Sequence, residues 1–231
     1  MNFKFLSSGD TIYLVAPSFG AASFPYKERL IKSIDFLKKQ NFKIIEGENI
    51  WLDEGIMGSN TPLKRAEEIE KAFKSDADFI WSVGGGETMN EILPYLNLSE
   101  IRKHPKLFMG YSDNTNLSYI LQTFLNFKTI YGPCAGTFGM EPWDESIEDC
   151  FSLFTGKKMM MQSYPLWEKE GLRDEEHPLE PYNLTEQSLV RGFLTQKDHT
   201  GEVQAFETEG TIKFKGRLIG GLSCKFNGNK V

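Results

Sequence analysis

The chain has 231 residues, of which 40% are hydrophobic and 13% aromatic, enough to bury a core in one large domain or two small ones. The formal net charge is −6 and no basic stripe is present, which argues against nucleic acid and an anionic membrane surface as partners. The N-terminus lacks the continuous apolar run of a secretory signal, and 18 apolar residues occur together nowhere. We therefore expect a cytoplasmic protein without a membrane span.

The three cysteines are Cys134, Cys150 and Cys224. They are odd in number and widely spaced, and they contain no C-x-x-C pair, so the sequence predicts neither a disulfide framework nor a zinc site. We expect them to be small buried or half-buried residues, and we expect no metal and no cofactor.

Strand-like and helix-like runs alternate through the first part of the chain. The β-rich runs cover residues 11–17, 42–46, 77–83 and 106–112. Helical spacing of apolar residues covers residues 25–40, 60–75, 114–124 and 145–156. In the second of these helices, Thr61 is placed to cap the N-terminus and Pro62 fits the first helical position. The alternation predicts an α/β fold, with a mostly parallel sheet flanked by helices.

The texture changes near residue 157. Residues 157–187 are polar, contain prolines and have no sustained period, so they are predicted to form a linker. The remainder shows short β segments with glycine turns. We therefore predict an N-terminal α/β domain over residues 1–156, a linker over 157–187, and an incomplete second, β-containing domain over 188–231.

The carboxyl ends of three predicted strands carry glycine- and serine-rich corners, and ligands of open α/β sheets bind at those ends. One corner, "GYSD", has the strand-turn-helix pattern of a nucleophile elbow. Ser112 would attack, and the backbone N–H of Asp113 would donate to the oxyanion. The usual Gly-x-Ser-x-Gly pattern has Asn114 at its fifth position here. The alternative is that Ser112 or Asp113 merely caps the following helix.

The stretch "VGGGE" (residues 83–87) lies at a neighbouring strand end. Backbone without side chains can approach a ligand there or point a second N–H at an oxyanion. The alternative is a plain glycine turn. No Gly-Lys-Ser/Thr follows and no dinucleotide fingerprint is present, which disfavours a phosphate-binding loop.

A nucleophilic serine needs a base, normally a histidine oriented by a carboxylate. The chain has only His104, His177 and His199, and each lies in a polar, solvated context. None of the three is a convincing base.

Four stretches of the sequence resemble a known protein family: "VAPS", "GGGETMNEILPYLNLSEIRKHPKLFMGYSDNT", "YGPCAGTFGM" and "GRLIGG". They resemble the LD-carboxypeptidase and microcin C immunity family of serine peptidases, in particular its microcin-immunity branch, from about residue 8 to residue 221. The resemblance implies that Ser112 is the nucleophile, and that the backbone amides of Asp113 and Gly86 hold the oxyanion. It also implies an N-terminal α/β domain joined by a long linker to a β-containing domain.

The resemblance implies cleavage of an amide bond near a free carboxylate. The substrate would be a small peptide, at a muropeptide L,D bond, or a peptidyl- or aminoacyl-nucleotide antibiotic. Family members commonly dimerise, so the resemblance allows a homodimer. The residues predicted to bind substrate are Gly85, Glu87, Phe138 and Trp143. For the two aromatic residues, a purely structural role remains equally open.

The chain departs from the family at its C-terminal end. Family members take the glutamate and histidine of a Ser-His-Glu triad from beyond the "GRLIGG" segment, and here only "LSCKFNGNKV" follows. We assign neither role to Glu207, Glu209 or His199. The first alternative is therefore a catalytically inactive truncated homologue, either a pseudogene product or a binding protein. A second is a small-molecule-binding α/β module without peptidase ancestry.

Overall fold

The computed structural model describes residues 4–160, 164–187, 192–197 and 203–208. Its contacts divide the chain into two compact units, which are described separately. The first unit contains the described residues up to 160, together with 172–181. Within the described residues, no helix is long and apolar enough to cross a membrane. His199, Glu209, Cys224 and the "GRLIGG" segment lie outside the described residues.

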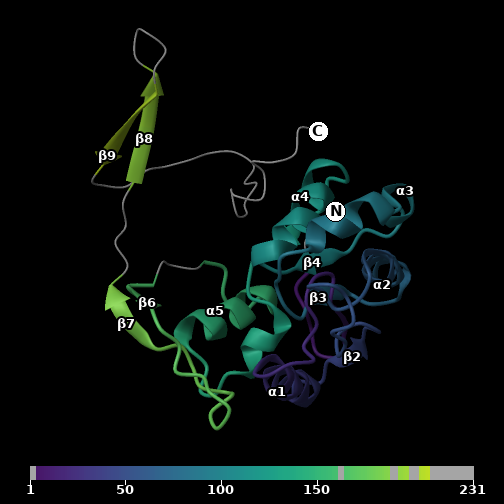
Figure 1. Ribbon diagram of the computed structural model, residues 1–231, viewed down its shortest axis with the longest axis horizontal. Helices are drawn as coiled ribbons and strands as arrows, with labels where there is room; N and C mark the ends of the chain where they lie inside the picture. Colours follow the sequence, from purple (N-terminus) through teal and green to yellow (C-terminus); the bar gives the residue numbers. More distant parts are fainter. Residues whose placement is uncertain (1–3, 161–163, 188–191, 198–202, 209–231) are drawn as a thin grey trace. The chain divides into compact units, whose positions relative to one another are not determined.

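The first unit is built on a five-stranded sheet whose paired strands all run parallel. Figure 1 labels β2, β3 and β4 of this sheet among the surrounding helices. Its strands are β1 (Thr11–Val15), β2 (Lys43–Glu46), β3 (Phe79–Ser82), β4 (Leu107–Met109) and β5 (Thr129–Ile130). Their spatial order is β2-β1-β3-β4-β5. The predicted α/β fold is confirmed, and four of the five strands lie where the sequence indicated them.

Helices connect the strands. The α-helices are α1 (Tyr26–Lys39), α2 (Pro62–Lys74), α3 (Leu98–Ile101), α4 (Thr115–Thr123) and α5 (Glu145–Phe154). The described residues of this unit also form the 3-10 helices η1 (Met89–Tyr95), η2 (Ser112–Asn114) and η3 (Ala135–Gly139). As predicted, Pro62 begins α2, and the side chain of Thr61 caps it by accepting the N–H of Lys64 at 3.4 Å.

Both faces of the sheet are covered, because successive side chains of a strand point to opposite faces. On one face, Ile80 and Phe108 belong to a buried cluster that includes side chains from α2, η1 and α4. On the other face, Trp81 packs edge-on against Phe138 of η3 and Phe154 of α5. The strands are consequently buried on both sides, as the nearly continuous apolar runs of β3 and β4 require.

The strand order places a topological switch point between β1 and β3. The connection after β1 leads to β2 on one side, whereas the connections after β3 and β4 lead the other way. Loops leaving the carboxyl ends of β1 and β3 diverge there and leave a crevice, where ligands of such sheets bind. The fold therefore directs attention to the loops that follow β1, β3 and β4.

Residues 172–181 belong to the first unit although the sequence predicted a linker there. The buried side chain of Arg29 donates from Nε to the carbonyl of Pro178 at 2.9 Å, and also to the carbonyl of Glu180. The N–H of Glu141 donates to the carbonyl of Leu179 at 2.8 Å. The stretch is held through its backbone carbonyls, which every residue type carries. Its attachment to the first unit therefore leaves no pattern in the sequence.

The second unit contains strands in two antiparallel pairs. β6 (Leu166–Glu168) pairs with β7 (Leu184–Gln187), and β8 (Gly192–Lys197) pairs with β9 (Val203–Thr208). The first pair lies within the stretch predicted as a linker. Strands of three and four residues are too short to establish an alternating pattern in the sequence.

Candidate active site

Ser112 lies at the sharp corner between β4 and α4. Its φ is +59°, in the left-handed region that is costly for a residue with a side chain. At Gly110, a Cβ atom would lie 2.7 Å from Cγ of Asn114, so the turn needs glycine at that position. The strained corner holds the hydroxyl of Ser112 above the strand end, as a nucleophile elbow does.

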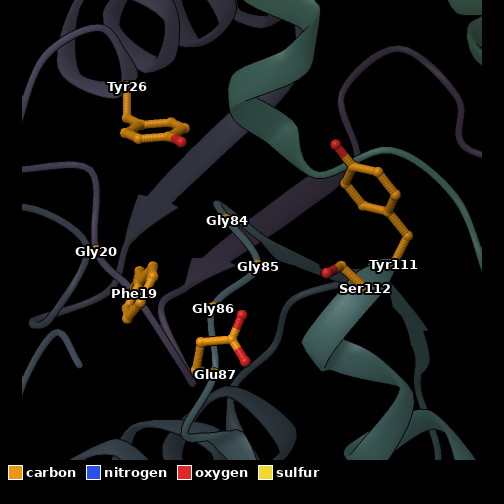
Figure 2. Close-up of a pocket in the computed structure, with 9 residues that line it drawn as sticks. All are labelled: Phe19, Gly20, Tyr26, Gly84, Gly85, Gly86, Glu87, Tyr111 and Ser112. Atoms are coloured by element: carbon orange, nitrogen blue, oxygen red, sulfur yellow. The ribbon is translucent and has the colours of Figure 1, made fainter. Parts of the chain in front are cut away.

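Ser112 lines a pocket of about 310 Å³ at the switch point (Figure 2). Its walls come from the loops after β1, β3 and β4 and from the start of α1. The lining residues are Phe19, Gly20, Tyr26, Gly84, Gly85, Gly86, Glu87, Tyr111 and Ser112. The predicted convergence of the "VGGGE" and "GYSD" corners is therefore present in the structure.

The glycine loop, defined here as residues 84–87, faces the Ser112 side chain (Figure 2). A Cβ atom at Gly85 would lie 3.3 Å from Oγ of Ser112, so a side chain there would crowd the hydroxyl. Gly86 has a φ of +150°, which residues with a Cβ rarely adopt. The loop therefore brings bare backbone up to the hydroxyl, which is the arrangement needed to present N–H donors to an oxyanion.

Asn114 explains the departure from the usual Gly-x-Ser-x-Gly pattern. Its Nδ2 donates to the carbonyl of Gly84 and to the carbonyl of Tyr111, at 2.9 Å each. The side chain thereby ties the glycine loop to the corner that carries Ser112. Glycine at this position could not make these bonds, so the substitution has a structural use here.

Tyr131 is a neighbour of Ser112 that the sequence did not indicate. Its hydroxyl accepts the backbone N–H of Ser112 at 3.3 Å, from a position directly after β5. The pairing of β4 with β5 brings Tyr131 beside the corner, across 19 residues of chain. A two-residue strand leaves no period in the sequence from which this proximity could be predicted.

A second nucleophilic atom lies near the corner but is inert. Cys134 is buried, and Nδ2 of Asn114 lies 3.5 Å from its Sγ. Burial raises the pKa of this thiol to about 12, so almost none of it is thiolate at neutral pH. Ser112 is only half-buried, so its hydroxyl is the more accessible of the two groups. Cys134 and Cys150 are both free and buried, as expected.

The structure separates the predicted site residues into two groups. Gly85, Gly86 and Glu87 line the pocket together with Ser112, and Asp113 is fully buried beside it. Phe138 and Trp143 are not among the residues that line the pocket. The Phe138 side chain is 1% exposed, and Nε1 of Trp143 donates to the Phe138 carbonyl at 2.8 Å. Their contribution to substrate binding stays a prediction.

Neither described histidine reaches the pocket. Nε2 of His104 lies 3.6 Å from a carboxylate oxygen of Glu100, and Nδ1 of His177 lies 2.9 Å from one of Asp174. Neither ring belongs to the pocket lining. Over the described residues, no group of three or more His, Cys, Asp and Glu side chains could hold a metal ion.

Glu68 of α2 is a buried carboxylate that anchors the loops bordering the site. It accepts the backbone N–H groups of Ala16 and Asn49 at 2.7 and 2.8 Å. Burial raises its pKa to about 7, although the two N–H donors act in the opposite direction. The carboxyl therefore holds its proton more tightly in the folded chain than in the unfolded chain.

This difference predicts a pH-dependent stability. Between the ordinary pKa of 4.5 and the folded value of about 7, the native state binds more protons, so the free energy of unfolding falls as pH rises. The full loss is on the order of 3 kcal/mol. We expect Glu68→Gln to flatten the slope of melting temperature against pH between pH 5 and 8. The variant will be less stable at pH 5, because an amide offers only one acceptor oxygen.

Glu67→Gln is the matched control for the Glu68 prediction, because Glu67 is the adjacent, exposed residue on the same helix. Its slope of melting temperature against pH should match that of the wild type. An equal slope in Glu68→Gln and wild type would contradict the assignment of the pH dependence to Glu68.

A strained serine between a strand and a helix, facing a glycine loop at a switch point, defines an α/β protein with a nucleophile elbow. Residues 12–132, which make up more than half of the chain, match the family model of the LD-carboxypeptidase N-terminal domain. The chain belongs to the LD-carboxypeptidase family of serine peptidases, which includes the microcin self-immunity protein MccF.

The relatives carry both names. The chain is 31% identical to the microcin C7 self-immunity protein MccF of Escherichia coli over 220 residues, 94% of this chain and 60% of that protein. It is 29% identical to a probable murein peptide carboxypeptidase of Bacillus subtilis over 135 residues, 58% of this chain and 41% of that protein. The chain thus spans less than two thirds of each of these proteins.

Solved structures of MccF are similar to this chain as well. MccF in complex with glutamyl sulfamoyl guanosine superposes with a TM-score of 0.68 at 26% identity, covering 82% of this chain and 58% of that one. MccF in complex with aspartyl sulfamoyl adenosine gives 0.64 at 25% identity, covering 88% and 56%.

Proposed function

We propose that this chain supplies the nucleophile and the oxyanion hole of a serine peptidase that hydrolyses an amide bond near a free carboxylate. The observation that carries the proposal is the position of Ser112. It stands at a left-handed φ, lines a pocket, and lies so close to Gly85 that a Cβ atom added there would be 3.3 Å from its Oγ. A structural cap would need neither the strained backbone nor the open space around the hydroxyl.

In the proposed reaction, Oγ of Ser112 attacks the amide carbonyl carbon and gives up its proton to a base. The backbone N–H groups of Asp113 and Gly86 donate to the oxygen that becomes negative. The C–N bond then breaks, and the leaving nitrogen takes the proton. Water attacks the ester and releases the carboxylic acid, which restores the serine.

The pocket and the relatives together support the proposed substrate class. The aromatic side chains of Phe19, Tyr26 and Tyr111 line the pocket, and such rings pack on a peptide or stack on a nucleobase. The two MccF complexes contain an amino acid linked to a nucleoside through a sulfamoyl group. We therefore propose an aminoacyl- or peptidyl-nucleotide as the first substrate class and a muropeptide with an L,D bond as the second.

A second candidate is a binding protein that keeps the pocket without turnover. The specific observation is that, in the described part of the chain, neither histidine lines the pocket, so no histidine is placed there to act as the base for Ser112. In this case the glycine loop and the aromatic walls would hold a ligand, and no acyl-serine would form.

The test uses the 231-residue chain and its Ser112→Ala variant. Each is incubated with aspartyl sulfamoyl adenosine and with an L,D muropeptide, and product release is followed by mass spectrometry. Separately, each is titrated with a peptide boronic acid, and boron NMR detects a tetrahedral adduct. We expect an adduct in the wild type and none in Ser112→Ala. Adduct without turnover would favour the binding protein, and no adduct would overturn the role of Ser112.

A further inference from the structure

Below the glycine loop lies a pair of buried side chains that the reaction scheme does not use. Oγ of Ser18 donates to Oδ2 of Asp113 at 2.5 Å, and both residues are fully buried. The two residues lie 95 positions apart, one in the loop after β1 and the other at the corner after β4. The sequence predicts that Asp113 supplies a backbone N–H or caps the following helix, and neither role involves Ser18.

The carboxylate of Asp113 connects three segments of the site. Oδ2 also accepts the backbone N–H of Met89, two residues beyond the glycine loop, at 2.8 Å. Oδ1 accepts Nδ2 of Asn116, in the first turn of α4, at 3.0 Å. Hydrogen bonds to a carboxylate are among the stronger ones in proteins. The loop after β1, the end of the glycine loop and the nucleophile corner therefore meet at one side chain.

Ser18 also packs against the backbone of Gly86. A Cβ atom at Gly86 would overlap with Oγ of Ser18, so the bare backbone of Gly86 lies directly against that hydroxyl. The N–H of Phe19 donates to the carbonyl of Gly85 at 3.1 Å, which ties the two loops a second time. The position of Gly86 relative to Ser112 is thus set through Ser18 and Asp113.

We propose that the Ser18–Asp113 side-chain pair is a positioning device that fixes the glycine loop relative to the nucleophile. Neither side chain faces the pocket, so neither touches the substrate. Asp113 then acts in two ways. Its backbone N–H is a proposed oxyanion donor, and its carboxylate fixes the position of the glycine loop relative to Ser112. The expected effect of the pair on catalysis rests on the proposed function, whereas its expected effect on the position of the glycine loop does not.

Two buried serines of the same unit provide matched controls. Ser33 on α1 and Ser118 on α4 are 0% and 2% exposed, and in the described part of the chain their hydroxyls have no hydrogen-bond partner. Ser18→Ala, Ser33→Ala and Ser118→Ala therefore remove the same atom from equally buried sites. Only Ser18→Ala removes the hydrogen bond between Ser18 and Asp113.

The first readout is amide hydrogen exchange of residues 84–89, which needs no activity. We expect Ser18→Ala and Asp113→Asn to accelerate exchange there about 10- to 100-fold, the factor that corresponds to losing a hydrogen bond to a charged group. Exchange in α5 should stay unchanged, and so should residues 84–89 in both control variants. Equal exchange of the loop in Ser18→Ala and Ser118→Ala would overturn the proposal, whatever the chain's activity.

The second readout is the affinity for a peptide boronic acid, whose adduct places an oxygen in the oxyanion hole. We expect Ser18→Ala to weaken adduct formation about 10-fold or more and to lower kcat rather than raise KM wherever turnover is measurable. A wild-type chain that forms no Ser112 adduct would overturn the proposed function, while the exchange experiment would still decide the positioning role. Accelerated exchange with unchanged adduct affinity would overturn the link to catalysis.

Discussion

Ser112→Gly is expected to abolish covalent reaction and yet give a more stable protein than Ser112→Ala. Both variants lose the hydroxyl of the proposed nucleophile, and removing the serine of a triad lowers kcat by roughly 10⁶-fold in a serine protease. They differ in the backbone. Alanine keeps a Cβ at a φ of +59°, whereas glycine adopts that conformation without strain.

The expected difference in stability can be estimated. A left-handed conformation costs a residue with a Cβ about 1 to 2 kcal/mol, and glycine avoids this cost. Glycine also loses more backbone entropy on folding, which destabilises the variant by about 0.5 to 1 kcal/mol. Ser112→Gly should therefore exceed Ser112→Ala by about 1 kcal/mol in the free energy of unfolding, measured by urea denaturation. The tetrahedral boronate signal should be absent in both.

Ser118→Gly is the control for this comparison. It makes the same substitution inside α4, where glycine should destabilise by about 1 kcal/mol relative to alanine. Glycine is thus expected to have opposite effects at residues 112 and 118. If Ser112→Gly proved less stable than Ser112→Ala, the corner would not be strained, and the structural argument for a nucleophile elbow would lose its main support.

The corner itself could be predicted because its signals are local. An apolar run, a glycine, a hydroxyl residue and an amphipathic helix follow one another within about 20 residues, and each step has a known backbone preference. The glycine loop could be predicted for a related reason. Parallel strands bring their carboxyl ends to one edge, so two glycine- and serine-rich corners at strand ends must be near each other.

Ser18 and Tyr131 could not be predicted, because their roles depend on partners far along the chain. Ser18 stands in "VAPS" as an ordinary loop residue, and only the fold places its hydroxyl against Asp113. Tyr131 follows a strand of two residues, too short to be read from the sequence. The family resemblance marks both stretches as conspicuous but does not say which atoms meet.

The aromatic residues Phe138 and Trp143 illustrate a different limit. The sequence leaves a substrate-binding role and a purely structural role open for both, because a position in the sequence does not fix the face on which a side chain lies. Trp81 projects from β3 to the face covered by η3 and α5, and Phe138 packs on its edge with 4.8 Å between ring centroids. The need to cover a buried tryptophan accounts for the position of Phe138.

The largest effect on folding is expected from Gly139→Ala. Gly139 ends η3, which packs closely against α1. A Cβ atom there would overlap with the carbonyl oxygen of Arg29 and lie 2.5 Å from its carbonyl carbon. Both are main-chain atoms inside a helix, so no rotamer change can relieve the clash. We expect a loss of at least about 3 kcal/mol in the free energy of unfolding, measured by urea denaturation.

Gly136→Ala in the same 3-10 helix is the matched control for Gly139→Ala. A Cβ atom at Gly136 would lie 3.2 Å from the carbonyl oxygen of Val83, a contact that a shift of a few tenths of an ångström relieves. We expect a loss of about 1 kcal/mol or less. Equal losses in the two variants would mean that η3 can move away from α1. In that case, the close approach of η3 and α1 would not be what holds the elements on this face of the sheet in place.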